Sequence, residues 1–174
     1  MLRLITIALS LLLTSPFAFS EDIQPEEEKT FDHFFLEGIR LKIAEKHNEA
    51  FKAFREALKI DPSSPAALYE IAQYYLGMED IVAATNSLKK AVENSPENTD
   101  YKTALADLYR ETGRYGEAID LYEELVEQHP DRAELHFYLS DLYIRVGEVD
   151  KAIQSLDNLE NNIGLNDMIS TQKY

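Results

Sequence analysis

The sequence contains no cysteine, which excludes a disulfide framework and a lipid-modified cysteine near the N-terminus. The folded chain must therefore be stabilised by packing alone. There is also no Asn-x-Ser/Thr sequon, which disfavours a glycosylated eukaryotic secretory protein. The 174 residues are 45% apolar and include eight Phe and ten Tyr, which is enough to bury a core.

Long apolar runs are absent except near the N-terminus. Residues 1–20, MLRLITIALSLLLTSPFAFS, have a basic start, an apolar run over 4–13 and the small residues Ala18 and Ser20 before Glu21. About ten apolar residues form a helix of roughly 15 Å, too short for a hydrocarbon core of about 30 Å. The pattern predicts a cleaved signal peptide rather than a membrane anchor, and hence export to the periplasm or cell envelope of a bacterium.

Basic residues are scarce, with 17 Lys and Arg against 32 Asp and Glu. Because Arg3 would leave with the signal peptide, the mature chain keeps 16 basic and 32 acidic residues, a net charge of −16. Such a surface repels phosphate and anionic headgroups, so we expect no nucleic acid partner and no membrane insertion after signal cleavage. The charge indicates either plain solubility or a preference for basic or neutral partner segments.

Patterns that carry catalysis or metal binding are also missing. The six glycines form no phosphate-binding loop, and no serine lies in a Gly-x-Ser-x-Gly elbow. The histidines at 33, 47, 129 and 136 show no His-x-x-x-His or His-Glu-x-x-His spacing. We therefore expect no catalytic residue, no metal and no cofactor, and we expect that the protein is not an enzyme.

What the sequence does contain is an internal repeat with a period of about 34 residues. Pro62, Pro96 and Pro130 recur at this interval, and the chain can be written in four aligned lines. These lines start at Phe31, Pro65, Thr99 and Ala133. Each line predicts two amphipathic helices of about 12 residues joined by a short turn. Since proline cannot continue a helix interior, the three prolines are expected to end the second helices.

The aligned columns indicate how the helices pack. Two columns hold small residues: Gly38, Ala72, Ala106 and Ser140, and Ala50, Ala84, Ala118 and Ala152. Two others hold large residues: Leu41, Tyr75, Tyr109 and Tyr143, and Phe54, Leu88, Tyr122 and Leu156. Small residues let paired helices approach, and the large ones fill the space beside them. Ser64 with Pro65, and Asp131 with Glu134, are expected to cap the helices that follow.

With these columns, the three prolines and the turns Gly113-Arg114-Tyr115 and Gly147-Glu148, the sequence resembles the tetratricopeptide repeat (TPR) family over residues 31 to about 166. The resemblance implies an all-α fold, a right-handed superhelical solenoid of about four helix-turn-helix repeats. Together with the predicted signal peptide and the missing sequon, it leads us to expect an exported bacterial member of this family. The predicted boundaries are a signal peptide over 1–20, an acidic disordered leader over 21–30, repeats over 31–64, 65–98, 99–132 and 133–166, and the start of a further or capping helix over 167–174.

Some positions depart from the family pattern. Glu37 replaces the usual leucine, and Lys102 and His136 stand in an apolar column that begins with Phe34 and Leu68. Terminal repeats are often atypical, which accounts for Glu37. Lys102 suggests a looser or wetter junction at the third repeat. Because the helix after the fourth repeat would be barely two turns long, we expect the chain to be the front part of a longer protein, with a naturally short protein as the alternative.

In the TPR family, the first helices of successive repeats line a concave groove that binds partner peptides or helices. The resemblance implies a partner-binding groove made by Phe35, Ile39, Lys42, Tyr69, Gln73, Leu76, Thr103, Asp107, Arg110, Phe137, Asp141 and Ile144. Phe35 and Ile39 stand where a chaperone-tail clamp needs Lys and Asn, so that mode of binding is disfavoured.

The aromatic lining instead favours an apolar anchor of the partner, flanked by a basic residue that meets Asp107 or Asp141. The alternative is that Phe35, Tyr69 and Phe137 only pack against the neighbouring first helix.

Three functions follow, with the partner's identity unknown. The first is a non-enzymatic protein-protein interaction scaffold in the cell envelope. The second is the sensing or recognition part of a larger signalling protein or enzyme. The third is a structural solenoid that self-associates through Leu156, Leu159, Ile163 and Leu165.

Overall fold

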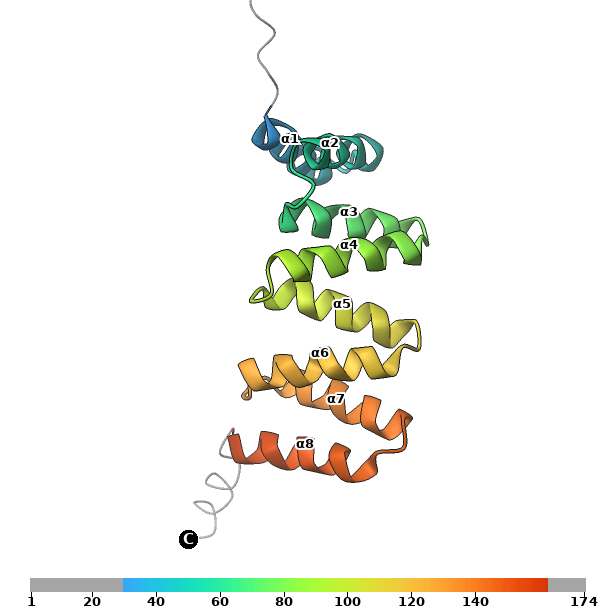
Figure 1. Ribbon diagram of the computed structural model, residues 1–174, viewed down its shortest axis with the longest axis vertical. Helices are drawn as coiled ribbons and strands as arrows, with labels where there is room; N and C mark the ends of the chain where they lie inside the picture. The colour runs from blue at the N-terminus through green and yellow to red at the C-terminus, as the bar shows by residue number, and fades with distance from the viewer. Residues whose placement is uncertain (1–29, 163–174) are drawn as a thin grey trace, which may run out of the picture.

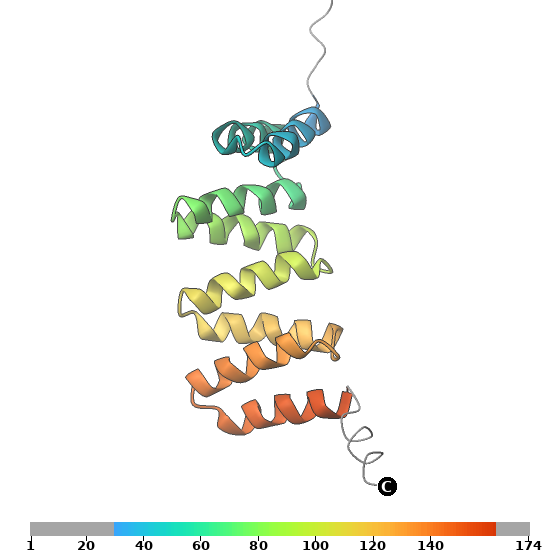
Figure 2. The ribbon, with the colours of Figure 1, turned by 180° about the vertical axis from the view of Figure 1, so that it is seen from behind.

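The computed structural model describes residues 30–162, which form eight α-helices and no strand. The helices are α1 (Phe31–Ile43), α2 (His47–Ile60), α3 (Pro65–Gly77), α4 (Ile81–Asn94), α5 (Thr99–Glu111), α6 (Tyr115–Gln128), α7 (Ala133–Arg145) and α8 (Val149–Asn162). They form four antiparallel pairs stacked in chain order along one axis, as Figures 1 and 2 show from opposite sides. The expected all-α helical repeat fold is confirmed. The predicted signal peptide, nearly all of the leader and the helix predicted over 167–174 lie outside the described residues.

The prolines end the second helices as expected. Helices α2, α4 and α6 end at Ile60, Asn94 and Gln128, in each case two residues before Pro62, Pro96 or Pro130. The predicted cap of α3 is also confirmed, because the Ser64 hydroxyl accepts the amide of Ala67 at 3.4 Å and Pro65 is the first helical residue. The chain therefore stops and restarts its helices with local signals alone.

The capping box predicted at Asp131 is wrong. Arg132 is the N-cap residue of α7, and no side chain caps that helix. The Arg132 Nε instead donates to Glu134 Oε1 at 2.8 Å, so the carboxylate that a capping box needs is held by the neighbouring guanidinium.

Each turn inside a helix pair contains one residue with left-handed backbone. These residues are Glu45 (φ 57°), Glu79 (φ 59°), Gly113 (φ 77°) and Gly147 (φ 84°), which occupy the same position of the four repeats. In all four turns the next amide donates to a carbonyl five residues earlier, at 2.8 to 2.9 Å, as in a Schellman motif. Glycine adopts this conformation without strain, whereas glutamate does not, so the first two turns hold a strained residue.

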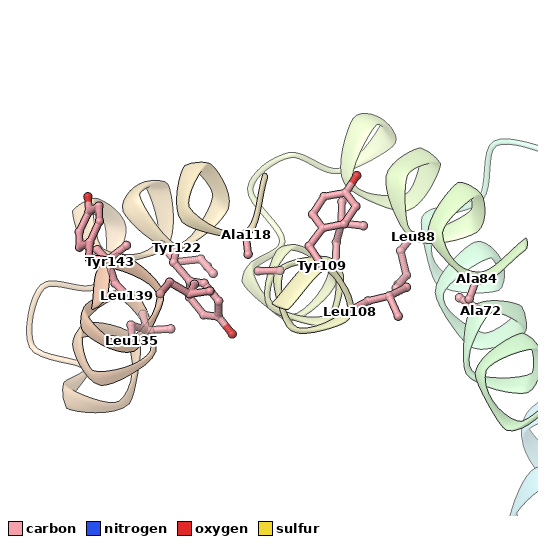
Figure 3. Packing of buried hydrophobic residues seen from close by; sticks show 14 of the residues in the cluster. Ala72, Ala84, Leu88, Leu108, Tyr109, Ala118, Tyr122, Leu135, Leu139 and Tyr143 are labelled. Atoms are coloured by element: carbon pink, nitrogen blue, oxygen red, sulfur yellow. The ribbon is translucent and has the colours of Figure 1, made fainter. Parts of the chain in front are cut away.

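The core follows the predicted columns. The small residues of both columns are buried, and Gly38 has no room for a side chain because an added Cβ would lie 2.6 Å from Phe54 Cε1. Figure 3 shows part of this core, with Leu88, Tyr109 and Tyr122 between the helices. Close approach of paired helices therefore depends on small side chains, as the alignment predicts.

Leu156 is the exception among the large residues, because its side chain is 38% exposed. Its equivalents pack against the helix of the next unit: the Phe54 ring lies 6.0 Å from that of Tyr74 in α3, and the Tyr122 ring 5.6 Å from that of Tyr138 in α7. No helix follows α8 within residues 30–162, so Leu156 lacks this cover in the described part of the chain.

The polar residues in the apolar column are buried and bonded. Lys102 is only 3% exposed, and its Nζ donates to Glu124 Oε2 in α6 at 2.7 Å. His136 is fully buried, with Nδ1 3.2 Å from Ser155 Oγ and Nε2 3.1 Å from the carbonyl oxygen of Pro130. The Lys102–Glu124 ion pair joins α5 to α6 inside the third unit, and the looser or wetter junction expected there stays a prediction.

Candidate functional site

All twelve predicted groove residues lie on the first helices α1, α3, α5 and α7. Four of them line one hollow of about 500 Å³, which we name the first-helix groove. Its lining comprises Phe35, Ala66, Tyr69, Glu70, Asn98, Asp100, Tyr101, Thr103, Ala104, Asp107 and Arg132. Phe35, Tyr69 and Thr103 are equivalent positions of three successive units, so one position of the repeat faces this groove three times.

Two further predicted residues, Lys42 and Gln73, line a second hollow of about 460 Å³, which we name the α2–α3 pocket. Its other walls are His47, Asn48, Phe51, Tyr74, Gly77 and Met78. The remaining six predicted residues, Ile39, Leu76, Arg110, Phe137, Asp141 and Ile144, lie outside these two hollows.

The aromatic residues of the predicted set have different surroundings. The Phe35 ring packs within its own unit, 5.5 Å from the ring of Phe31 and 5.7 Å from that of Phe54. The Tyr69 ring lies 5.0 Å from that of Tyr101 in the next first helix. Phe137 is 57% exposed and makes no such ring contact within residues 30–162. Of these three rings, Tyr69 is the one that has a ring contact with the neighbouring first helix within residues 30–162.

The two acids expected to meet a basic partner residue are already paired. Asp107 Oδ1 accepts hydrogen bonds from Arg110 at 2.8 Å and from the Tyr122 hydroxyl at 2.6 Å. Asp141 accepts from Arg145 Nε at 2.6 Å. One oxygen of each carboxylate is therefore already bonded within the protein, and the nearby guanidinium weakens the attraction of each acid for a partner cation.

One acid of the first-helix groove is not paired in this way. The carboxylate of Asp100 forms no hydrogen bond or ion pair with any residue of 30–162, whereas Glu70 is bound to Lys42 at 2.7 Å. Arg132, the basic residue of the lining, is paired with Glu134. Asp100 is thus the acid in this groove best able to meet a partner cation.

Sequence reasoning missed Tyr101, Glu70 and Asp100 in the groove. Tyr101 could have been found, because it is the one tyrosine in its column of the repeat alignment. Glu70 and Asp100 carry no signal of that kind, since acidic residues are common along the whole chain.

The α2–α3 pocket is mainly apolar and aromatic. The Tyr74 ring lies 5.9 Å from that of Phe51 and 6.4 Å from that of His47. The Tyr74 hydroxyl is buried and has no hydrogen-bond partner among residues 30–162. Burial raises the pKa of Tyr74, so this side chain stays neutral. The pocket could hold an apolar side chain against its rings.

The histidines lie apart: His33 in the first turn of α1, His47 at the start of α2, His129 beyond the end of α6 and His136 inside α7. Among the described residues, no group of three or more His, Cys, Asp or Glu side chains could hold a metal ion. Nor does the stretch 30–162 include a helix with the length and apolarity needed to cross a membrane.

Comparison with known proteins agrees with this architecture. Family models described as tetratricopeptide repeat match residues 41–108 and 103–162, which together cover 41–162. The crystal structure of MamA is similar, with a TM-score of 0.67 and 18% identity over 85% of this chain and 84% of that one. YrrB, described as a TPR protein with an unusual peptide-binding site, has a TM-score of 0.68 and 18% identity over 85% and 81%.

One curated relative is the probable UDP-N-acetylglucosamine--peptide N-acetylglucosaminyltransferase SPINDLY of Solanum lycopersicum. It is 29% identical over 89 residues, which cover 51% of this chain and 10% of that protein. The chain thus matches about a tenth of the length of this relative.

Proposed function

The chain belongs to the tetratricopeptide repeat family, and we propose that it is a non-enzymatic protein-protein interaction scaffold that binds a partner segment in the first-helix groove. The observation that carries this proposal is the shared position of Phe35, Tyr69 and Thr103 in three successive units, all of which line one hollow. An extended segment lying along the stack would meet this position once in each unit.

The lining suggests what such a segment looks like. Tyr69 and Tyr101 offer paired rings for an apolar side chain, and the unpaired carboxylate of Asp100 offers a site for a Lys or Arg. A partner segment with an apolar residue close to a basic one fits both features. YrrB, which has a similar fold, is described as having a peptide-binding site, and this supports a peptide as the class of ligand.

Affinity capture tests this proposal. The native protein and the Tyr69→Glu variant serve as baits in an extract of the source cells, and Val82→Glu is the control, since Val82 is 72% exposed on α4 outside the groove. We expect a partner that both the native protein and Val82→Glu retain and that Tyr69→Glu loses, while circular dichroism shows the same helical content. A partner that all three baits retain would contradict binding in the groove.

Export to the bacterial periplasm or cell envelope is a further part of the proposal. It is supported by the basic start, apolar run and small residues of residues 1–20, which are typical of a cleaved signal peptide. The test is the mass of the protein in cell fractions. An envelope protein that begins at Glu21 supports the proposal, and an intact N-terminus in the soluble cell interior contradicts it.

A recognition role inside a larger enzyme or signalling protein is the second candidate. One observation favours it, because the matched part of the curated relative is only 10% of a much longer protein. Reading the natural transcript beyond the codon of Tyr174 tests it: further coding sequence supports the candidate, and an immediate stop codon rejects it.

Self-association is the third candidate, and the exposed face of α8 favours it. Val149, Ile153 and Leu156 share one side of that helix and are all exposed. Of the edge predicted from the sequence, Leu159 is buried, and Ile163 and Leu165 lie outside the described residues. Light scattering over micromolar concentrations tests this candidate, since a constant monomer mass rejects it.

A further inference from the structure

The acidic protein contains one basic stretch. Residues 39–60 hold six Lys or Arg and three Glu, a net charge of +3, whereas the rest of the chain after residue 20 has a net charge of −19. This stretch covers the end of α1, the first turn and all of α2. The net charge of the protein repels an acidic partner segment. Salt screening limits the reach of each charge to about 10 Å, so close to residues 39–60 the local positive charge attracts such a segment.

The unpaired cations also gather in this stretch. Nine of the Lys and Arg residues within 30–162 form ion pairs. Those without an ion pair in the described part are Lys46, Lys52, Arg55, Lys89 and Lys90. Lys46, Lys52 and Arg55 belong to the basic stretch and are exposed, so their charges are available to a partner.

These cations lie beside the α2–α3 pocket. The Arg55 guanidinium carbon is 5.8 Å from the centroid of the Phe51 ring, which forms a wall of the pocket. Lys52 follows the pocket residue Asn48 by one helical turn, and side chains at this spacing are neighbours. An apolar hollow and unpaired positive charges therefore adjoin on α2.

The opposite rim of the pocket has the other sign of charge. Met78 is followed by Glu79 and Asp80, and Asp80 Oδ1 accepts the amide of Ala83 at 3.0 Å, which caps α4. Lys42, at the α1 side, is bound to Glu70. The α2 side is therefore the rim with unpaired cations, Lys52 and Arg55, although Glu49 of the same helix lies next to Asn48 and reduces their attraction for a negative group.

We propose that the α2–α3 pocket is a second binding site, separate from the first-helix groove, that takes an apolar side chain from a partner segment rich in Asp and Glu. The apolar side chain would lie against Phe51, Tyr74 and Met78, and the adjacent carboxylates would pair with Lys52 and Arg55. The overall charge of the protein suggests basic or neutral partners, whereas the local charge at this pocket selects acidic ones.

Gly77 provides a way to block the pocket without disturbing the fold. It is the last residue of α3, it lines the pocket, and an added Cβ would meet no atom within 4 Å. Gly77→Leu should therefore fill the pocket while α3 stays intact. Gly116 has equally open surroundings and lies in α6, outside the pocket, so Gly116→Leu is the matched control.

The test begins with a random peptide library displayed on phage and selected on the full protein at low salt. We expect the enriched peptides to combine Asp or Glu with an aromatic or aliphatic residue. The Kd of the most enriched peptide is then measured by fluorescence anisotropy with the native protein and its variants. Enriched peptides that are neutral or basic overturn the proposal.

Two pairs of variants locate the bound peptide. Gly77→Leu, and the double variant Lys52→Glu/Arg55→Glu, should each raise the Kd at least about tenfold. Gly116→Leu, and Lys89→Glu/Lys90→Glu with the same change in net charge, should change it less than about twofold. Equal weakening by both charge variants would show general electrostatic attraction and overturn the proposal, as would full binding by Gly77→Leu.

The same peptide separates this site from the first-helix groove. We expect Tyr69→Glu to leave its Kd unchanged. A peptide that Tyr69→Glu releases and Gly77→Leu retains would bind in the groove, which overturns the second site and leaves the proposed scaffold function standing.

Discussion

The Tyr122 hydroxyl of α6 donates a hydrogen bond to Asp107 Oδ1 of α5 at 2.6 Å. This bond ties the buried Tyr122 side chain, on the second helix of the third unit, to the edge of the first-helix groove, which Asp107 lines. The Arg110 guanidinium donates to the same carboxylate oxygen at 2.8 Å and lies over the Tyr138 ring of α7 at 4.6 Å. The groove wall at Asp107 is thus held in place by groups of three helices.

Removal of the hydroxyl should loosen this wall. Tyr122→Phe keeps the buried ring but removes the bond to a charged acceptor, so we expect the free energy of unfolding to fall by about 1 to 2 kcal/mol. Urea denaturation measures the change. Tyr74→Phe is the matched control, because the buried Tyr74 hydroxyl has no partner among residues 30–162. The free energy of unfolding of Tyr74→Phe should equal or exceed that of the native protein. An equal loss of stability in Tyr122→Phe and Tyr74→Phe would contradict a stabilising role of the hydrogen bond between Tyr122 and Asp107.

High pH should destabilise the protein through its buried tyrosines. Burial, and then the hydrogen bond to Asp107, raises the pKa of Tyr122 well above its usual range, and burial with the hydrogen bond to Glu123 raises the pKa of Tyr143. Tyrosines of the unfolded chain ionise near pH 10. Since the folded pKa values are higher, this contribution to stability is complete below pH 10 and is lost as the pH rises above it.

The urea midpoint measured from pH 8 to pH 11 tests this expectation. It should fall above pH 10 in the native protein and fall less in Tyr122→Phe/Tyr143→Phe. If the urea midpoint fell equally steeply with pH in the two proteins, groups other than Tyr122 and Tyr143 would cause the loss of stability at high pH.

Glycine at the strained turns should stabilise the protein. Glu45→Gly and Glu79→Gly replace a left-handed glutamate with the residue that the third and fourth turns already use. We expect each to raise the free energy of unfolding by about 0.5 to 1 kcal/mol, because the lost strain exceeds the added chain entropy. Thermal and urea unfolding check this. Lys52→Gly, in the interior of α2, should instead lower the free energy of unfolding by about 1 kcal/mol. A loss of stability in Glu45→Gly as large as that in Lys52→Gly would contradict strain at Glu45.

The contact between Gly38 and Phe54 should tolerate no additional carbon. Gly38→Ala places a Cβ within 2.6 Å of the fully buried Phe54 ring, and we expect a loss of about 1 to 3 kcal/mol. Urea denaturation measures it. Gly116→Ala, where the Cβ meets open space, should not destabilise the chain. Phe54→Leu in the Gly38→Ala background should cost less than in the native protein, because the smaller side chain relieves the clash.

Much of this fold could be predicted from the sequence because each signal is local. Evenly spaced prolines and small residues in fixed columns act within one helix pair, so they need no knowledge of the rest of the chain. The exposure of Leu156 could not be read in this way, since burial at that position depends on a following helix. The cap predicted at Asp131 failed because the N-cap of α7 is the next residue, Arg132, whose side chain binds Glu134.

The candidate site was less predictable. The resemblance to the TPR family placed Phe35, Tyr69 and Thr103 on first helices, and the structure brings all three to one groove. The pairing of Lys42 with Glu70, across 28 positions of sequence, depends on the side-chain conformations at the junction of two units. Whether an acid is free or paired is therefore a tertiary property, so the sequence could not show that Asp107 and Asp141 already have internal hydrogen-bond donors. Their expected contact with a basic partner residue stays a prediction.

The most direct test of the groove is site-specific photocrosslinking in the source cells. A benzophenone amino acid replaces Thr103 in the first-helix groove, and in a control protein it replaces the exposed Val82. We predict that Thr103 crosslinks to one segment of one partner, that this product disappears in the Tyr69→Glu background, and that Val82 gives no such product. Crosslinks to the same partner from Val82, or a Thr103 product that survives Tyr69→Glu, would contradict a scaffold that binds its partner in this groove.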